Sequence, residues 1–70
     1  MSDMVQVVVN GEPRSVARGA TLLGLLAALE LDPRTVVVEH KRAIVRRLRL
    51  GEVTVAPGDA IELVHFVGGG

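Results

Sequence analysis

Three glycines, Gly68 to Gly70, follow directly on an apolar run with strand-like alternation, Ala60 to Val67. Because glycine lacks Cβ, three in a row form the narrowest extended peptide and can enter a channel that a side chain would block. We expect residues 67–70 to be a flexible tail that presents the α-carboxylate of Gly70 to a protein able to activate it. A frayed chain end also commonly carries such residues, so the glycines alone leave both interpretations open.

Other reactive side chains are few and scattered. The only imidazoles are His40 and His65, and the only serines are Ser2 and Ser15. None of the four lies in a serine elbow, a phosphate-binding glycine loop or a spacing typical of metal ligands. We therefore expect no catalytic residue, no metal site and no cofactor bound by the chain itself.

Composition narrows the function classes further. Seventy residues make one small domain, so we treat residues 1–70 as a single unit. Phe66 is the only aromatic residue, which argues against binding nucleic acid through base stacking. A net charge of zero also makes the whole molecule a poor partner for phosphate backbones or anionic lipid. With no targeting signal or membrane-spanning run, a cytoplasmic location is expected.

The first half of the sequence indicates a hairpin followed by a helix. Residues 4–9 are β-branched and apolar, Asn10-Gly11 is a strong turn dipeptide, and residues 14–17 can form the returning strand. Thr21 is placed to cap a helix that starts at Leu22. The apolar residues of this helix repeat at the spacing of one buried face: Leu22, Leu25, Leu26 and Leu29. Asp32-Pro33 is expected to end the helix.

The second half indicates three more strands. They are predicted at residues 35–39, 53–55 and 60–66, the last delivered by a Pro57-Gly58-Asp59 turn. The basic segment 41–49 between them is read either as a solvated loop or edge strand or as a patch that steers an acidic partner. One helix across a mixed sheet of about five strands gives an α+β fold.

Strand alternation predicts which face of the sheet meets partners. Ile61 and Leu63 should face the helix, whereas Val64 and Phe66 should point the other way. Val8 of the first strand should also point outward. Together with Val67, these residues would form an exposed apolar patch beside the tail, which is the kind of surface that marks a docking site. Single exposed apolar residues are also common on ordinary surfaces.

The pattern as a whole resembles a known family. The segment 59–70, with His65-Phe66-Val67 before the three glycines, is similar to the C-terminus of the ThiS family, the sulfur carrier proteins of thiamine biosynthesis. Asn10-Gly11, Thr21-Leu22, Val37-Val38-Glu39 and Ile44-Val45 occur in the family's order and spacing. The resemblance covers nearly the whole chain and implies a ubiquitin-like β-grasp fold.

The sequence departs from the family pattern in one place. After the third strand the family commonly has a polar turn with asparagine and glycine, and a proline after the Ile-Val pair. Here His40-Lys41-Arg42 occupies the turn and Arg46 replaces the proline. The departure affects how partners would be chosen along this edge, but it leaves the tail unchanged.

The resemblance implies a division of labour between this chain and its partners. A ubiquitin-activating-type adenylating enzyme would use ATP and magnesium to adenylate the Gly70 carboxylate. A sulfur donor protein would then replace AMP and leave a thiocarboxylate, which a thiazole synthase would accept. Gly68 and Gly69 would provide reach and a narrow cross-section. The chain itself would be a substrate and not an enzyme.

Three alternatives stay open at this point. A sulfur carrier for molybdopterin would share the fold and the diglycine chemistry. A ubiquitin-like protein modifier would join its tail to lysines of target proteins. A binding-only β-grasp module would have a chemically idle tail, so replacing Gly70 would leave its function intact.

Overall fold

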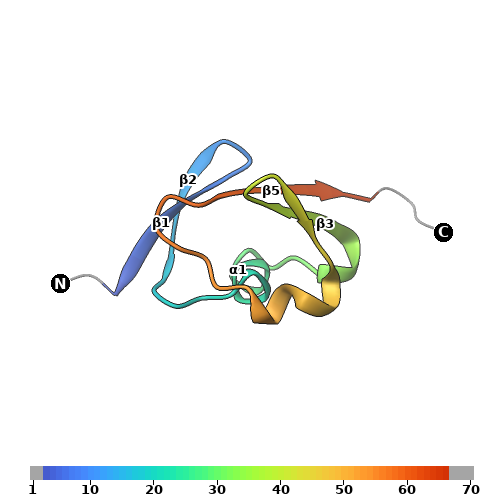
Figure 1. Cartoon of the computed structure of the whole chain (residues 1–70), viewed down its shortest axis with the longest axis horizontal. Coiled ribbons are helices and arrows are strands. Elements are labelled where there is room, and N and C mark those ends of the chain that lie inside the picture. Colours follow the sequence, from blue (N-terminus) through green and yellow to red (C-terminus); the bar gives the residue numbers. More distant parts are fainter. Residues whose placement is uncertain (1–2, 67–70) are drawn as a thin grey trace.

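The computed structural model describes residues 3–66, which form a five-stranded mixed sheet with one α-helix packed across it (Figure 1). The strands are β1 (Met4–Val9), β2 (Glu12–Ala17), β3 (Val36–His40), β4 (Ala43–Val45) and β5 (Ala60–His65), in the spatial order β2-β1-β5-β3-β4. Helix α1 spans Leu22–Ala28, and two 3₁₀ helices span Pro33–Thr35 (η1) and Arg47–Glu52 (η2). The α+β prediction, with a mixed sheet of five strands and one helix, is confirmed.

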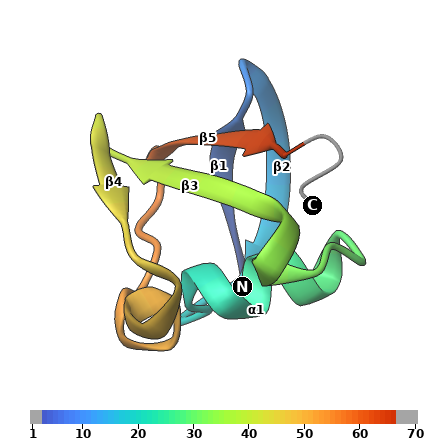
Figure 2. The same cartoon turned by 90° about the vertical axis from the view of Figure 1, so that its right-hand side faces the viewer.

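The sheet combines two antiparallel hairpins with one parallel contact. β1 pairs with β2 and β3 pairs with β4, each antiparallel and each joined by a short turn. β5 is the last strand of the chain but the central strand of the sheet, parallel to β1 and antiparallel to β3. Figure 2 shows β4 at the edge of the sheet beyond β3. Residues 67–70 therefore follow a strand that lies in the middle of the sheet.

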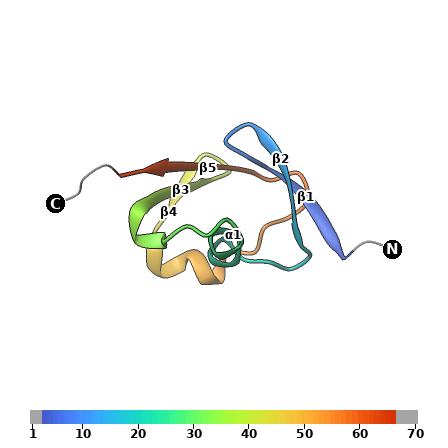
Figure 3. The same cartoon turned by 180° about the vertical axis from the view of Figure 1, so that it is seen from behind.

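Helix α1 begins where the sequence predicts. The hydroxyl of Thr21 accepts a hydrogen bond from Gly24 N at 3.1 Å, which satisfies one of the free N–H groups of the first turn. Leu22, Leu25 and Leu26 are fully buried, and α1 lies across one face of the sheet (Figure 3). The helix ends at Ala28, four residues before Asp32, because Glu30 adopts a positive φ of 59° that breaks the helical backbone.

The core lies between α1 and the sheet. Alternate residues of β1 and β5 point into it, and the buried set is entirely aliphatic: Val5, Val7, Val9, Val16, Leu22, Leu25, Leu26, Val36, Val38, Leu50, Val55, Ile61 and Leu63. Asp59 is the only buried charged residue among residues 3–66. No helix within that range has both the length and the apolar character that a bilayer crossing requires.

The predicted fourth strand was wrong. Residues 53–55 form no strand; they touch the start of α1 through an isolated bridge between Thr54 and Thr21, and Leu22 N donates to Val53 O at 2.9 Å. The fourth strand is β4, which lies inside the basic segment, and η2 follows it. The sequence left a loop or an edge strand open for this segment, because three apolar residues between basic ones are too few to show strand alternation.

The turn between β3 and β4 has an unusual backbone. His40 pairs with Ala43, so Lys41 and Arg42 form a two-residue turn. Both have positive φ, 54° and 70°, as in a type I′ turn, where Asn-Gly is the favoured pair. Two basic, non-glycine residues are thus held in a backbone conformation that is costly for side chains with Cβ.

Candidate functional site

The base of the C-terminal segment is fixed to the folded domain. β5 pairs with β3 as far as His65, which lies opposite Val36. Phe66 N then donates a hydrogen bond to Thr35 O at 2.9 Å, so the last described residue is anchored beside η1. The predictions for Val67, Gly68, Gly69 and Gly70 lie outside the described residues.

On its other edge, β5 is held by a side chain. The parallel contact with β1 ends at the pair of Val9 and Ile61. Beyond it, Leu63 N donates to Asn10 Oδ1 at 2.7 Å, and Asn10 Nδ2 donates to Leu63 O at 3.3 Å. The Asn10 carboxamide thus takes the place of the next backbone unit of β1 and extends the support of β5 toward the tail.

The outer face of the sheet carries an apolar patch at the end of β5. Ile61 and Leu63 are buried beneath α1 as predicted, while Val64 is 53% and Phe66 55% exposed. Val64 pairs directly with Val37 of β3, which is half-buried on the same outer face. The patch is therefore Val37, Val64 and Phe66, next to the point from which residues 67–70 continue.

Val8 does not join this patch. It is half-buried and pairs with Ala60 at the start of β5, four positions before Val64 in the sequence. At ~3.3 Å per residue this places Val8 about 13 Å away along the strand. Glu62 lies between them on the same face. A docking role for Val8 stays a prediction, but it belongs to a different part of the surface.

A groove lies on the β4 side of the patch. It has a volume of about 260 Å³ and is lined by residues from η1, β3, β4 and the end of β5, including Val37, Ile44 and Phe66. Ile44 is 68% exposed. Arg34, Arg46 and Arg47 also line the groove, so its rim is basic. The basic segment and the end of β5 therefore meet in space, which sequence spacing did not predict.

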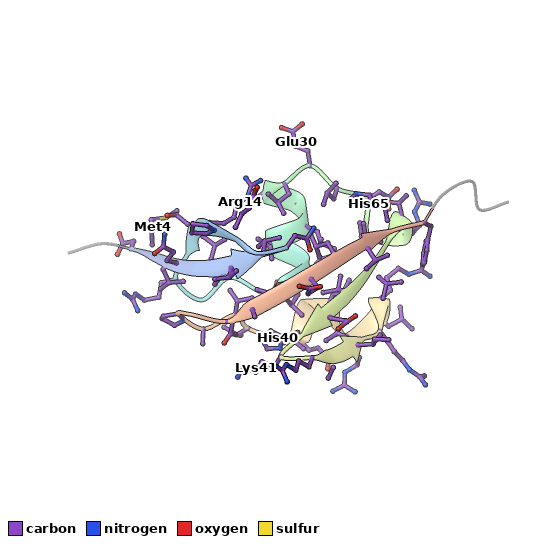
Figure 4. The ribbon with its side chains drawn as sticks, turned by 90° about the horizontal axis from the view of Figure 1, so that it is seen from above. Met4, Arg14, Glu30, His40, Lys41 and His65 are labelled. Atoms are coloured by element: carbon purple, nitrogen blue, oxygen red, sulfur yellow. The ribbon has the colours of Figure 1, made fainter. Side chains whose placement is uncertain are left out.

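A buried polar cluster supports the opposite end of β3. His40 Nε2 donates to Asp59 Oδ2 at 2.7 Å, and Ala56 N donates to the same oxygen at 2.8 Å. Burial raises the pKa of Asp59, but the hydrogen bonds from His40 and Ala56 and the charge of Lys41 outweigh this effect and leave it below its ordinary value. Figure 4 shows His40 and Lys41 together, far from His65. The cluster joins the β3–β4 turn to the turn before β5.

His40 lies in no sequence motif, and nothing in the sequence indicates a partner for it. Its side chain is only 12% exposed, and its partner lies 19 residues away, beyond the reach of any local motif. Glu39 and Glu62, for which no motif indicates a role, lie opposite each other on β3 and β5. No group of three or more His, Cys, Asp or Glu residues within 3–66 is arranged to hold a metal ion.

Comparison with known proteins identifies relatives of this chain. Residues 7–70 match the model of the ThiS family. The chain is 44% identical over 50 residues to the sulfur carrier protein ThiS of Bacillus subtilis, covering 71% of this chain and 76% of that carrier. It is also 44% identical over 66 residues to a thiazole synthase of Magnetococcus marinus, covering 94% of this chain. The chain spans only 20% of the length of that thiazole synthase.

A solved structure supports the same assignment. The crystal structure of the thiamine biosynthesis protein ThiS from Geobacter metallireducens superposes with a TM-score of 0.81 at 35% sequence identity. The superposition covers 94% of this chain and 100% of that protein. The order of the strands and the helix across the sheet agree with this superposition, and the family match runs through residue 70. The chain belongs to the ThiS family.

Proposed function

We propose that this chain is a sulfur carrier for the thiazole of thiamine, with Gly70 as its carboxyl-terminal, sulfur-bearing residue. The observation that carries the proposal is the family match, which extends over the glycines to residue 70. The similarity to a named sulfur carrier over most of that carrier's length supports it. In this role the chain is a substrate, and its partners perform the catalysis.

The first step is activation of the tail. An oxygen of the Gly70 carboxylate attacks the α-phosphorus of ATP in the active site of an adenylating partner, and pyrophosphate leaves. Magnesium bound by that partner with ATP neutralises the phosphate charge that develops. The product is an acyl adenylate, in which AMP is a good leaving group. We place this step in the cytoplasm.

The second step exchanges oxygen for sulfur. Hydrosulfide supplied by a sulfur donor protein attacks the carbonyl carbon of Gly70, a C–S bond forms, and the C–O bond to AMP breaks. The resulting thiocarboxylate is a stronger nucleophile than a carboxylate. A thiazole synthase is the proposed acceptor. Two relatives that carry that name, from Magnetococcus marinus and Paramagnetospirillum magneticum, each contain a stretch similar to 94% of this chain.

The described domain suits the presentation of such a tail. Phe66 is anchored to Thr35, so residues 67–70 continue from a fixed point on the surface. Four residues reach at most about 14 Å when fully extended. A partner must therefore approach closely, and it must contact the protein surface around Phe66. We assign docking to Val64, Phe66 and the next residue in the sequence, Val67.

The proposal is tested by the mass of the intact protein after reaction. The purified chain is incubated with ATP, magnesium, sulfide and an adenylating enzyme that has been shown to activate another ThiS carrier. We expect a mass increase equal to one oxygen replaced by sulfur. Deletion of Gly70 should abolish the increase.

A matched control replaces a glycine of the folded domain. Gly51→Ala introduces a Cβ that meets only Leu23 Cδ2 at 3.6 Å, an ordinary contact, so this variant should react like the native chain. An unchanged mass for the native chain, with the enzyme active on its other carrier, would refute the proposal.

A further inference from the structure

The groove beside Phe66 has the size and lining of a site for a protein side chain. Its volume of about 260 Å³ lies below the ~300 Å³ at which pockets for drug-sized ligands begin. Val37, Ile44 and Phe66 give it an apolar floor, and its opening adjoins the base of the tail. An apolar side chain of a docked partner would fit this depression.

The three arginines on the rim of the groove differ in whether they form an ion pair. Arg34 is paired with Asp32 at 2.8 Å, and Arg49 is paired with Glu52 at 2.8 Å. Arg46 and Arg47 are exposed and form no ion pair with any residue between 3 and 66. The residues that line the groove include no Asp or Glu. Two guanidinium groups without an ion pair thus flank an apolar depression, and the charge of Arg47 contributes to the lowered pKa of Asp32.

We propose that this groove docks an acidic segment of the adenylating enzyme, with one apolar side chain of that segment filling the depression. The inference rests on the proposed function and names the surface by which the first partner holds the chain. That enzyme must bind the chain before any modification, and the groove adjoins the base of the tail that it would activate.

The chemistry of the rim selects the occupant. A guanidinium group presents a planar set of N–H donors that matches a carboxylate in two parallel hydrogen bonds. Opposite charges on two surfaces also accelerate their association, most strongly at low salt. A partner segment with a carboxylate on either side of an apolar residue would therefore pair its carboxylates with Arg46 and Arg47 and pack its apolar side chain into the groove. Docking there places the partner against the base of the tail.

The test compares two charge reversals. The double variant R46E/R47E inverts the rim, and the control R14E/R18E makes the same change in charge on β2 and the residue after it. Figure 4 places Arg14 on the β1–β2 side, away from His65 at the end of β5. All four arginines are exposed, and near-native melting temperatures would show that both variants fold. The dissociation constant for an adenylating enzyme of the ThiS type is measured at low and at high salt, and adenylation is followed in parallel.

We expect R46E/R47E to weaken binding by about tenfold or more and to lose most of the salt dependence. R14E/R18E should change the dissociation constant by less than about threefold. Equal effects of the two variants, with the native chain adenylated, would overturn the groove assignment and leave the carrier function standing. Binding that depends on Arg46 and Arg47 without adenylation would instead contradict the carrier function alone. Absence of any binding by the native chain would refute both.

Discussion

The Asn10 carboxamide binds both backbone polar groups of Leu63, 53 residues away, and thereby acts as a further residue of β1 alongside β5. Asn10 also occupies the first position of the β1–β2 turn with a φ of 51°, and Gly11 follows with a φ of 82°. Asparagine tolerates this left-handed conformation better than most residues. One residue thus shapes the first hairpin and secures the strand that leads to the tail.

Replacing Asn10 separates these two roles. Asn10→Gly keeps the left-handed backbone accessible but removes both hydrogen bonds to Leu63, and should lower the free energy of unfolding by about 1–3 kcal/mol. Asn10→Ala loses the same bonds and adds strain, so it should cost about 1 kcal/mol more. Urea unfolding followed by circular dichroism measures both values. A glycine variant as stable as the native chain would show that the Leu63 contacts contribute nothing.

The β3–β4 turn should be easy to stabilise. Arg42 has a φ of 70° at the second position of this type I′ turn, where glycine is favoured, so Arg42→Gly removes the backbone cost and keeps Lys41 beside Asp59. We expect the free energy of unfolding to rise by about 1 kcal/mol or more. Arg46→Gly is the matched control, because Arg46 has an ordinary φ of −67° and should gain nothing. Equal stability changes in the two variants would contradict the strain assigned to this turn.

The buried carboxylate of Asp59 predicts a loss of stability in acid. Its pKa is lowered in the folded protein, because the opposing effect of burial is outweighed by hydrogen bonds from His40 and Ala56 and by the charge of Lys41. A lowered folded pKa stabilises the protein above the unfolded pKa near 3.8, and this contribution is lost as pH falls through the folded value. The free energy of unfolding should therefore decline as pH drops below about 4.

Asp59→Asn tests the origin of that decline. The amide oxygen accepts the His40 and Ala56 hydrogen bonds only as a neutral group and no longer attracts Lys41, so the variant should be less stable by about 1–3 kcal/mol at neutral pH and should show a weaker dependence on acid. Asp3→Asn, at an exposed carboxylate, is the control. An acid profile for Asp59→Asn that matches the native one would assign the decline to other groups.

The exposed Asp32–Arg34 pair should behave differently. Hydrogen bonds from the Arg34 side chain and backbone lower the pKa of Asp32 to about 2, yet both side chains are largely in solvent at 42% and 73% exposure. Water and salt screen such a pair, so most of its apparent strength is not expected as stability. Asp32→Asn should change the unfolding midpoint far less than Asp59→Asn does, as measured in the same urea series.

Substitutions in the apolar patch should affect reactions with partner enzymes and not the stability of the fold. Val64→Ala with Phe66→Ala should impair adenylation and thiazole formation, because a partner loses the surface next to the tail. Stability should change little, since these side chains are 53% and 55% exposed. Leu23→Ala is the control: Leu23 is 42% exposed on α1, across the sheet from the patch. Unchanged rates in the double variant would place docking elsewhere.

Local patterns predicted the elements that local chemistry determines. The β1 strand, the Asn10-Gly11 turn, the Thr21 cap and the alternation of β5 each follow from residues close in sequence, and the structure contains all of them. Strand β4 was not predicted as a separate strand because its three apolar residues, between basic ones, are too few to show alternation. The 53–55 segment looked like a strand because valine alternates there, but tertiary contacts hold it against α1.

The contacts that organise the site join distant residues. Asp59 was read as a turn residue, and nothing near it in sequence points to His40. The groove likewise joins η1, β4 and Phe66, which only the order of strands in the sheet brings together. Sequence alternation also placed Val8 and Val64 on one face correctly, but it could not give the register that separates them.

The most direct measurement follows the sulfur itself. The chain is treated with ATP, an adenylating enzyme and isotopically labelled sulfide, and its C-terminal peptide is then fragmented in a mass spectrometer. The account predicts one labelled sulfur in place of oxygen on Gly70, and transfer of that label to the thiazole product when a thiazole synthase and its other substrates are added. Label absent from Gly70, or present there but never recovered in the thiazole, would contradict a sulfur carrier of thiamine biosynthesis.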